Sequence, residues 1–170
     1  GYLDIDRSIF LSNVDMGRII KAPVYSILLM DPLGPILIDL GLNPDGVKEP
    51  EKAWGARAKL IKPQLTEEDD VRFRLKELGL SVSDVKMVIL THMHWDHTGA
   101  LSFFTHCPII VQRDEYRFAF RPDPFLAAPY MPNHIEHPLN YQLMDGDGFV
   151  APGVSVIKSP GHTPGHQSVL

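Results

Sequence analysis

The stretch THMHWDHTGA, residues 91–100, places three histidines and an aspartate within six consecutive positions. It follows the apolar run VKMVIL at 85–90, which predicts a buried β-strand. Residues two apart do not share a helix face, so His92 and His94 cannot converge from a regular helix, but they could converge from the turn that leaves this strand. Imidazole nitrogens and carboxylate oxygens are ligands of Zn²⁺ and other first-row ions. The pattern therefore predicts a metal site without thiolate ligands at the end of a strand, where α/β proteins bind ligands.

The segments around this stretch predict an α/β arrangement. Thr66 is the expected N-cap of a helix that ends at Gly79. The strands on either side of the histidines are apolar nearly throughout, which favours a sheet covered on both faces. The expected order is a helix at 66–79, the strand at 85–90, a short helix near 99–105, the strand PIIVQ at 108–112 and a helix at 113–120.

The first third of the chain is predicted to be rich in strands. SIFLS (8–12), VYSILLMD (24–31) and PILIDLGL (35–42) are apolar and β-branched, and the turn signal DPLG between the last two predicts a hairpin. Residues 43–65 are expected to form a long loop with a short helix near Trp54. Residues 121–138 contain five prolines and predict a surface excursion, after which LNYQLM, FVAPG and VSVIK predict short strands.

Composition limits the class of protein and its partners. The 170 residues carry a net charge of −5 and no run of Lys or Arg, which disfavours a nucleic-acid partner. Cys107 is the single cysteine, so it excludes an internal disulfide and fits the cytoplasm, and a buried thiol is favoured over a nucleophile. No apolar run approaches the roughly 20 residues of a membrane span. The sequence starts at Gly1 rather than at Met, so the question of a removed leader peptide stays open.

A second histidine motif lies in SPGHTPGHQS, residues 159–168, directly after the expected strand VSVIK. Proline and glycine around His162 predict a tight turn that would hold this imidazole near the first cluster. His92, His94 and His162 then form a three-histidine site with an open fourth position, as in catalytic zinc sites. Asp96 and His97 remain for a second ion.

The other histidines and the serines have weaker assignments. His166 is favoured as an outer partner of the site over direct ligation. His106, His134 and His137 have no partner at ligand spacing, so core or surface positions are expected for them. Ser159 and Ser168 lack the sequence context of a nucleophile elbow, which argues against a serine hydrolase.

At these residues the sequence resembles the metallo-β-lactamase superfamily. The superfamily signature HxHxDH stands at residues 92–97, and the GH turn stands at Gly161-His162. Stretches outside the signature are similar to the N-acyl homoserine lactonases, bacterial quorum-quenching enzymes, and the similarity covers most of residues 20–170. These stretches are GPILIDLG (34–41), PQLTEEDD (63–70), PIIVQRDEY (108–116), LNYQLMDGD (139–147) and SPGHTPGHQSVL (159–170).

The resemblance implies a fold and a ligand set. The fold is a four-layer αβ/βα sandwich with a two-metal site at one edge of its sheets. His92, His94 and His162 would bind one zinc, and Asp96 and His97 would bind the other. Other first-row divalent metals could take the place of zinc. Trp95 falls where the family carries an aromatic residue beside the substrate's acyl chain. The family's bridging aspartate, tyrosine and last histidine would follow Leu170.

The end of the chain affects the expected domain. HQSVL stops at Leu170 just as an apolar strand begins, and such a strand would lack partners for its backbone groups. We therefore expect residues 1–170 to be a single metallo-β-lactamase-like domain, truncated before its last strands and helices.

Lactone hydrolysis is the leading functional hypothesis. Two metals would activate water to open the ring of an N-acyl homoserine lactone, and Asp96 would orient that water and pass a proton to the leaving alkoxide. Two alternatives stay open: a glyoxalase II-like thioesterase or broad esterase of the same fold, and a truncated, non-catalytic metal-binding domain. The expected partner is a small molecule, and homo-oligomerisation is left open. The acidic composition disfavours a nuclease.

Overall fold

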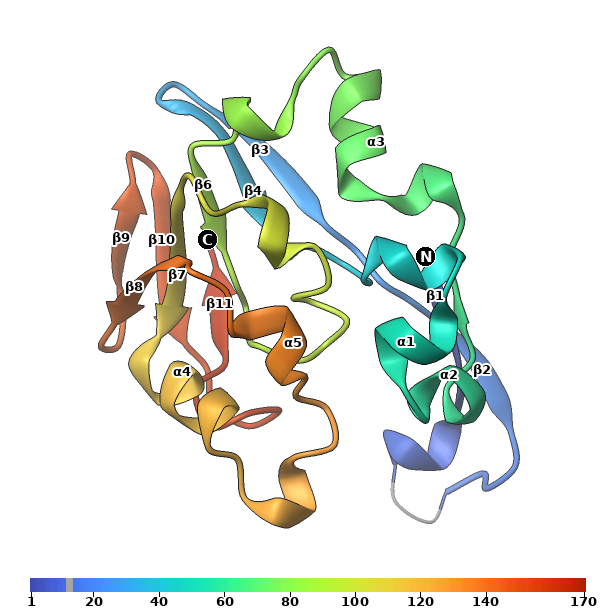
Figure 1. Cartoon of the computed structure of the whole chain (residues 1–170). Helices are drawn as coiled ribbons and strands as arrows, with labels where there is room; N and C mark the ends of the chain where they lie inside the picture. Colours follow the sequence, from blue (N-terminus) through green and yellow to red (C-terminus); the bar gives the residue numbers. More distant parts are fainter. Residues whose placement is uncertain (12–13) are drawn as a thin grey trace.

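A five-stranded sheet forms the centre of the molecule (Figure 1). The computed structural model describes residues 1–11 and 14–170. Strands β4, β6, β7 and β8 run parallel to one another, and β3 forms an antiparallel hairpin with β4. The order across the sheet is β3 (Ile27–Asp31), β4 (Gly34–Ile38), β6 (Met87–Ile89), β7 (Pro108–Gln112) and β8 (Asn140–Met144).

Two smaller antiparallel sheets flank this centre. One has the order β11 (Gln167–Val169), β10 (Val154–Lys158), β9 (Gly148–Ala151). The other has the order β2 (Ile19–Pro23), β1 (Tyr2–Asp6), β5 (Pro63–Gln64). The β2-β1-β5 sheet lies with α1 (Pro50–Trp54) and α2 (Arg57–Leu60) on the right of Figure 1.

Strand side chains alternate between two buried faces of the central sheet. The isoleucines at positions 36, 38, 89 and 110 pack with the β9-β10-β11 sheet. Their neighbours Leu37, Val88, Ile109 and Val111 pack on the other side against helices α3 (Val71–Glu77), α4 (Arg113–Phe120) and α5 (Pro132–Ile135). The helices, the central sheet and the β9-β10-β11 sheet are thus three consecutive layers of the predicted sandwich, and burial on both faces explains the apolar runs of the central strands.

Several predicted elements are confirmed. The hairpin through residues 31–34 pairs Asp31 with Gly34, and the helix at 113–120 has the predicted bounds. The helix within 66–79 begins later than predicted. Asp70 caps α3, whereas Thr66 caps a separate 3-10 turn at Glu67–Asp69. The short helix near 99–105 is a 3-10 turn, Leu101–Phe103.

The prediction for the N-terminal segment was wrong. Residues 8–11 of SIFLS lie in the 3-10 turn η1 (Arg7–Ile9) and the bend after it, and residue 12 lies outside the described residues. The strands are instead β1 and β2, which pair in antiparallel register from Tyr2 with Pro23 to Asp6 with Ile19. Ile9 and Phe10 remain more than half exposed, because they do not lie in a sheet face that packs on the core.

Two later segments that the sequence predicts as loops contain more secondary structure or more buried residues than expected. Residues 43–65 contain the 3-10 turn η2 (Pro44–Val47), α1, α2 and β5, and the helix expected near Trp54 is α1. Within 121–138, the 3-10 turn η6 (Pro124–Leu126) is exposed, but Tyr130 and His134 are buried, because they pack under the histidine loop. The final strand, β11, has a partner in β10.

Gly99 fixes the histidine loop against the chain that follows β4. Its N–H donates to the Gly41 carbonyl at 2.9 Å, and an added Cβ would lie 2.1 Å from the Asn43 nitrogen and 2.2 Å from the Leu42 carbonyl carbon. These neighbours are backbone atoms, so only displacement of the chain would make room.

We expect Gly99→Ala to destabilise the protein by about 1–3 kcal/mol, because the methyl group overpacks a backbone contact. Urea unfolding of the full-length protein measures this change. Gly148→Ala is the matched control, since its Cβ would meet only the mobile end of Met144. Equal unfolding midpoints for the two variants would contradict the close approach at Gly99.

Candidate metal centre

The candidate site lies where neighbouring parallel strands end. Asp39 follows β4, the histidine loop follows β6, and α4 follows β7, so all three begin at the same edge of the central sheet. The turn between β10 and β11 reaches this edge from the β9-β10-β11 sheet. The Gln167 N–H donates to the Thr91 carbonyl at 2.9 Å, which joins the two segments beside the histidines.

Three histidines from the two motifs meet at this edge. One ring nitrogen from each of His92, His94 and His162 can be chosen so that all three lie within 4.8 Å of one another. His162 Nε2 lies 3.1 Å from His94 Nδ1, and the His92 ring centroid lies 4.5 Å from that of His94 and 4.7 Å from that of His162. The structure thus brings together the triad that the sequence predicts.

His92 provides the test of whether these residues fit a metal ion. Its side chain is buried, and its Nε2 has no hydrogen-bond partner among the described residues. A buried polar atom without a partner costs roughly 1–3 kcal/mol, and a cation would supply the missing partner. Burial and the neighbouring imidazoles lower the pKa of His94 to about 3 and lower that of His92 further. Both rings are therefore neutral at neutral pH, with lone pairs available to a metal.

The residues expected at the second ion lie next to this triad. The His97 ring centroid is 4.0 Å from that of His92, and His97 Nε2 is 3.6 Å from Asp96 Oδ2. His97 Nδ1 donates to Asp39 Oδ2 at 2.8 Å. Burial would lower the pKa of His97, but the hydrogen bond and charge of Asp39 outweigh it and raise that pKa.

Asp39 was missed as a site residue in the sequence, although it stands in the quoted stretch GPILIDLG. Its carboxylate also accepts hydrogen bonds from the N–H and the hydroxyl of Thr91, both at 2.8 Å. Its backbone has φ +55, a left-handed conformation that Asp tolerates better than most residues. The carboxylate thus fixes both the start of the histidine loop and the orientation of the His97 ring. A carboxylate directly after a buried strand was the available signal.

The roles predicted for Trp95, beside the acyl chain, and for His166, as an outer partner of the site, stay predictions. Trp95 is 3% exposed and packs edge to face on Trp54, with ring centroids 6.2 Å apart. His166 Nδ1 lies 3.0 Å from Ser159 Oγ, and its ring centroid is 5.4 Å from that of His92.

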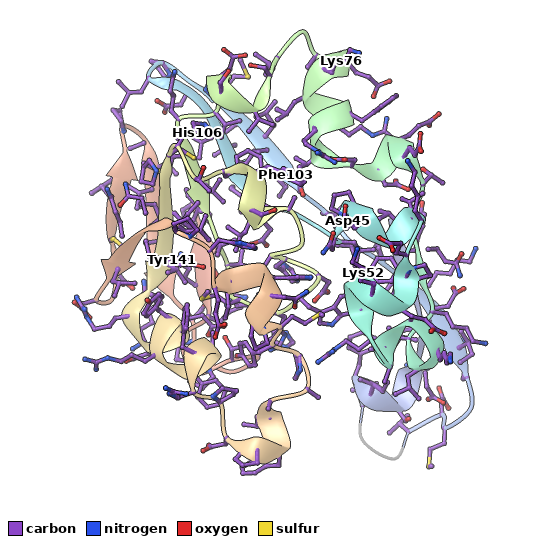
Figure 2. All side chains as sticks on the ribbon, in the orientation of Figure 1. Asp45, Lys52, Lys76, Phe103, His106 and Tyr141 are labelled. Carbon is purple, nitrogen blue, oxygen red and sulfur yellow. The ribbon has the colours of Figure 1, made fainter. Side chains whose placement is uncertain are left out.

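The remaining histidines lie outside the cluster, as predicted. Figure 2 shows His106 far along the sheet from α4, and its Nε2 lies 3.1 Å from the Val85 carbonyl oxygen. His134 is buried, with its Nε2 3.3 Å from the Asn43 amide nitrogen. The thiol of Cys107 is also buried, which raises its pKa to about 11 and argues against a nucleophile.

A cavity of about 520 Å³ opens onto the histidine cluster. His94, Asp96, His97 and His162 are among its lining residues. The rest of the lining is mostly apolar and comes mainly from β1, η1, β2, α4, the segment after α4 and the turn around His162. It includes Ile5, Ile9, Phe10, Phe118, Leu126 and Tyr130. Within the described part of the chain, the lining contains no Lys or Arg.

Comparison with known proteins identifies the family. The model of the metallo-β-lactamase superfamily matches residues 21–170. The chain belongs to the metallo-β-lactamase superfamily. This match confirms the predicted fold and the resemblance to this superfamily. No helix within the two described ranges has both the length and the apolar character needed to cross a membrane.

Within this superfamily the chain is similar to lactonases. It is 38% identical over 167 residues to an N-acyl homoserine lactonase of Bacillus cereus, covering 98% of this chain and 65% of the relative. An N-acyl homoserine lactonase of Agrobacterium fabrum is 34% identical over 165 residues, covering 93% and 63%. A solved N-acyl homoserine lactone hydrolase, with N-hexanoyl-L-homoserine bound at its catalytic metal centre, matches with a TM-score of 0.87 and 37% identity over 99% of this chain and 66% of that one. The chain thus spans about two thirds of the length of these relatives.

We expect His162→Ala to weaken metal binding by more than about 100-fold, because it removes a direct ligand rather than an outer partner. Metal content after dialysis and competition with a chromophoric chelator measure this loss. His137→Ala, outside the cluster, serves as the control. Unchanged metal content in the His162 variant would refute the three-histidine site.

The Asp39→Asn variant tests whether the hydrogen bond from His97 to the Asp39 carboxylate supports metal binding. Asn keeps the tolerance for positive φ but loses the charge and the acceptor geometry, so metal affinity should fall about 10–100-fold. The same chelator competition measures it, with Asp123→Asn, an exposed position, as the control. Wild-type affinity in Asp39→Asn would show that the hydrogen bond to His97 does not support the site.

Proposed function

We propose that this chain forms the metal-binding and substrate-binding part of a hydrolase that opens the lactone ring of N-acyl homoserine lactones. One observation carries the proposal: the imidazoles of His92, His94 and His162 meet beside a cavity whose remaining lining is mostly apolar. The similarity to N-acyl homoserine lactonases over nearly the whole chain supports it.

The polar residues in the cavity lining account for the proposed chemistry. His92, His94 and His162 would hold one zinc ion, and Asp96 and His97 would contribute to a second. When bound, such ions polarise an ester carbonyl and make water nucleophilic at neutral pH. Asp96 lines the cavity beside His97, so its carboxylate could orient the attacking water, take a proton from it and pass that proton to the departing alkoxide. Asp96 is therefore the proposed catalytic residue, and zinc is proposed because the donors are imidazole and carboxylate.

The apolar walls favour an acyl lactone over a glutathione thioester. A glutathione conjugate carries carboxylates that cationic side chains would bind, and the described lining has neither Lys nor Arg. An acyl chain gains roughly 0.8 kcal/mol for each methylene group buried on apolar surface.

The buried single cysteine, Cys107, fits a reducing compartment, and the cytoplasm is the proposed location.

Metal-loaded full-length protein should open N-hexanoyl homoserine lactone, with acid release followed in a pH-stat. We expect kcat/KM for the lactone to exceed that for S-lactoylglutathione by at least about 10-fold, because one apolar contact is worth 1–3 kcal/mol in selectivity. His92→Ala is the inactive control. A metal-loaded protein that leaves the lactone intact, or prefers the thioester, would rule out the proposal.

Leu126 offers a test of acyl-chain placement, because it lines the cavity while its neighbour Phe125 does not. Leu126→Asn should lower kcat/KM for a decanoyl lactone about 10-fold more than for a butanoyl lactone, through lost contact with about two methylene groups. Phe125→Asn, at an exposed side chain, should leave the ratio unchanged. An equal effect of Leu126→Asn on both substrates would place the acyl chain elsewhere.

A further inference from the structure

Glu115 is a fully buried carboxylate that neither histidine motif contains. It lies on α4 and is 0% exposed. Within residues 1–11 and 14–170, no Lys, Arg or His nitrogen forms a salt bridge with it. A buried acid without a cation is costly, and proteins keep such a group only where hydrogen bonds or a metal compensate it.

The hydrogen bonds of Glu115 reach both metal-ligand loops. Its Oε1 accepts the Met93 N–H at 2.8 Å, and its Oε2 accepts the Gly165 N–H at 3.2 Å. Met93 stands between His92 and His94, and Gly165 stands in the turn after His162. One carboxylate therefore joins two loops that are about 70 residues apart in sequence, and it does so through backbone donors whose positions also set those of the ligand side chains.

A third donor and a close backbone contact hold this carboxylate in place. The Tyr130 hydroxyl donates to Oε1 at 3.3 Å, and the Tyr130 ring lies edge to face on His94, with centroids 4.9 Å apart. At Gly165 an added Cβ would lie 2.0 Å from the Glu115 nitrogen. The second loop therefore packs directly on the backbone of α4, and any side chain at position 165 would push it away.

The negative charge of Glu115 contributes to the charge balance of the metal site. The three histidines of the triad are neutral, so the proposed ligands supply one carboxylate, Asp96, to ions of positive charge. Asp39 and Glu115 add buried carboxylates on the two sides of the histidine loop. Buried charges interact over longer distances than exposed ones, because water and salt screen them less.

We propose that Glu115 is a positioning residue for the metal centre, which holds the two ligand loops at the spacing that the ion requires and contributes negative charge close to it. The proposal rests on the metal site and is independent of the substrate. Loss of this carboxylate leaves every ligand side chain in the protein but changes how the His162 turn lies relative to His92 and His94.

The test compares metal binding in full-length variants. Glu115→Gln keeps the shape but replaces one acceptor oxygen with a donor that opposes an N–H or the Tyr130 hydroxyl, and we expect about 10–100-fold weaker zinc affinity by chelator competition. Tyr130→Phe removes one of three donors, and a loss of less than about 5-fold is expected. Glu68→Gln, an identical change at an exposed position, should leave affinity unchanged.

A spectroscopic measurement separates positioning from general stability. With Co²⁺ in place of zinc, Glu115→Gln should shift the visible absorption bands, because the ligand spacing changes, whereas a merely destabilised fold would lower the melting temperature and leave the bands alone. If Glu115→Gln does not fold, Gly165→Ala decides, since it displaces the second loop and leaves the acid intact. Wild-type zinc affinity and wild-type cobalt bands in the folded variant would overturn the proposal. Neither measurement uses a lactone, so this failure is distinct from failure of the proposed function.

Discussion

The histidine loop is a buried stretch of backbone without regular structure, and its amide groups need partners from outside the loop. A helix would satisfy most of its amides internally, but side chains two positions apart, as those of His92 and His94 are, do not share a helix face. The partners come from different parts of the fold, and every second residue of the loop's first half is held. The acceptors are the Asp39 carboxylate for Thr91, the Glu115 carboxylate for Met93, and the Pro129 carbonyl for Trp95.

This arrangement explains why carboxylates that bind no proposed ion are buried beside the site. Asp39 is held in a left-handed conformation, and Glu115 has no salt-bridge partner in the described part of the chain, so both are costly in isolation. Each accepts backbone donors that set the path of the loop. Each also places negative charge near imidazoles that burial keeps neutral. Stability and metal binding therefore depend on the same hydrogen bonds.

The cavity joins this polar edge to the N-terminal sheet and the segment after α4. Leu3 and Ile5 of β1 reach it from one side, and Phe118 and Tyr130 from another. Tyr130 belongs to both parts, because its ring lines the cavity and its hydroxyl donates to Glu115. Apolar walls around a cluster of imidazoles suit a substrate with a reactive polar end and an aliphatic tail.

Local pattern was enough to predict the central strands, the β3-β4 hairpin, helix α4 and the convergence of His92, His94 and His162. Apolar runs and ligand spacing are properties of neighbouring residues, and the end of a buried strand has a fixed place in an α/β sheet. The position of Asp39 directly after a buried strand was a weaker signal, no ligand-like spacing marked Glu115 or Tyr130, and the prediction of SIFLS as a strand in place of β1 and β2 was wrong. Tertiary structure decided these, because a lone carboxylate or an apolar run gains its partners only when distant segments pack beside it.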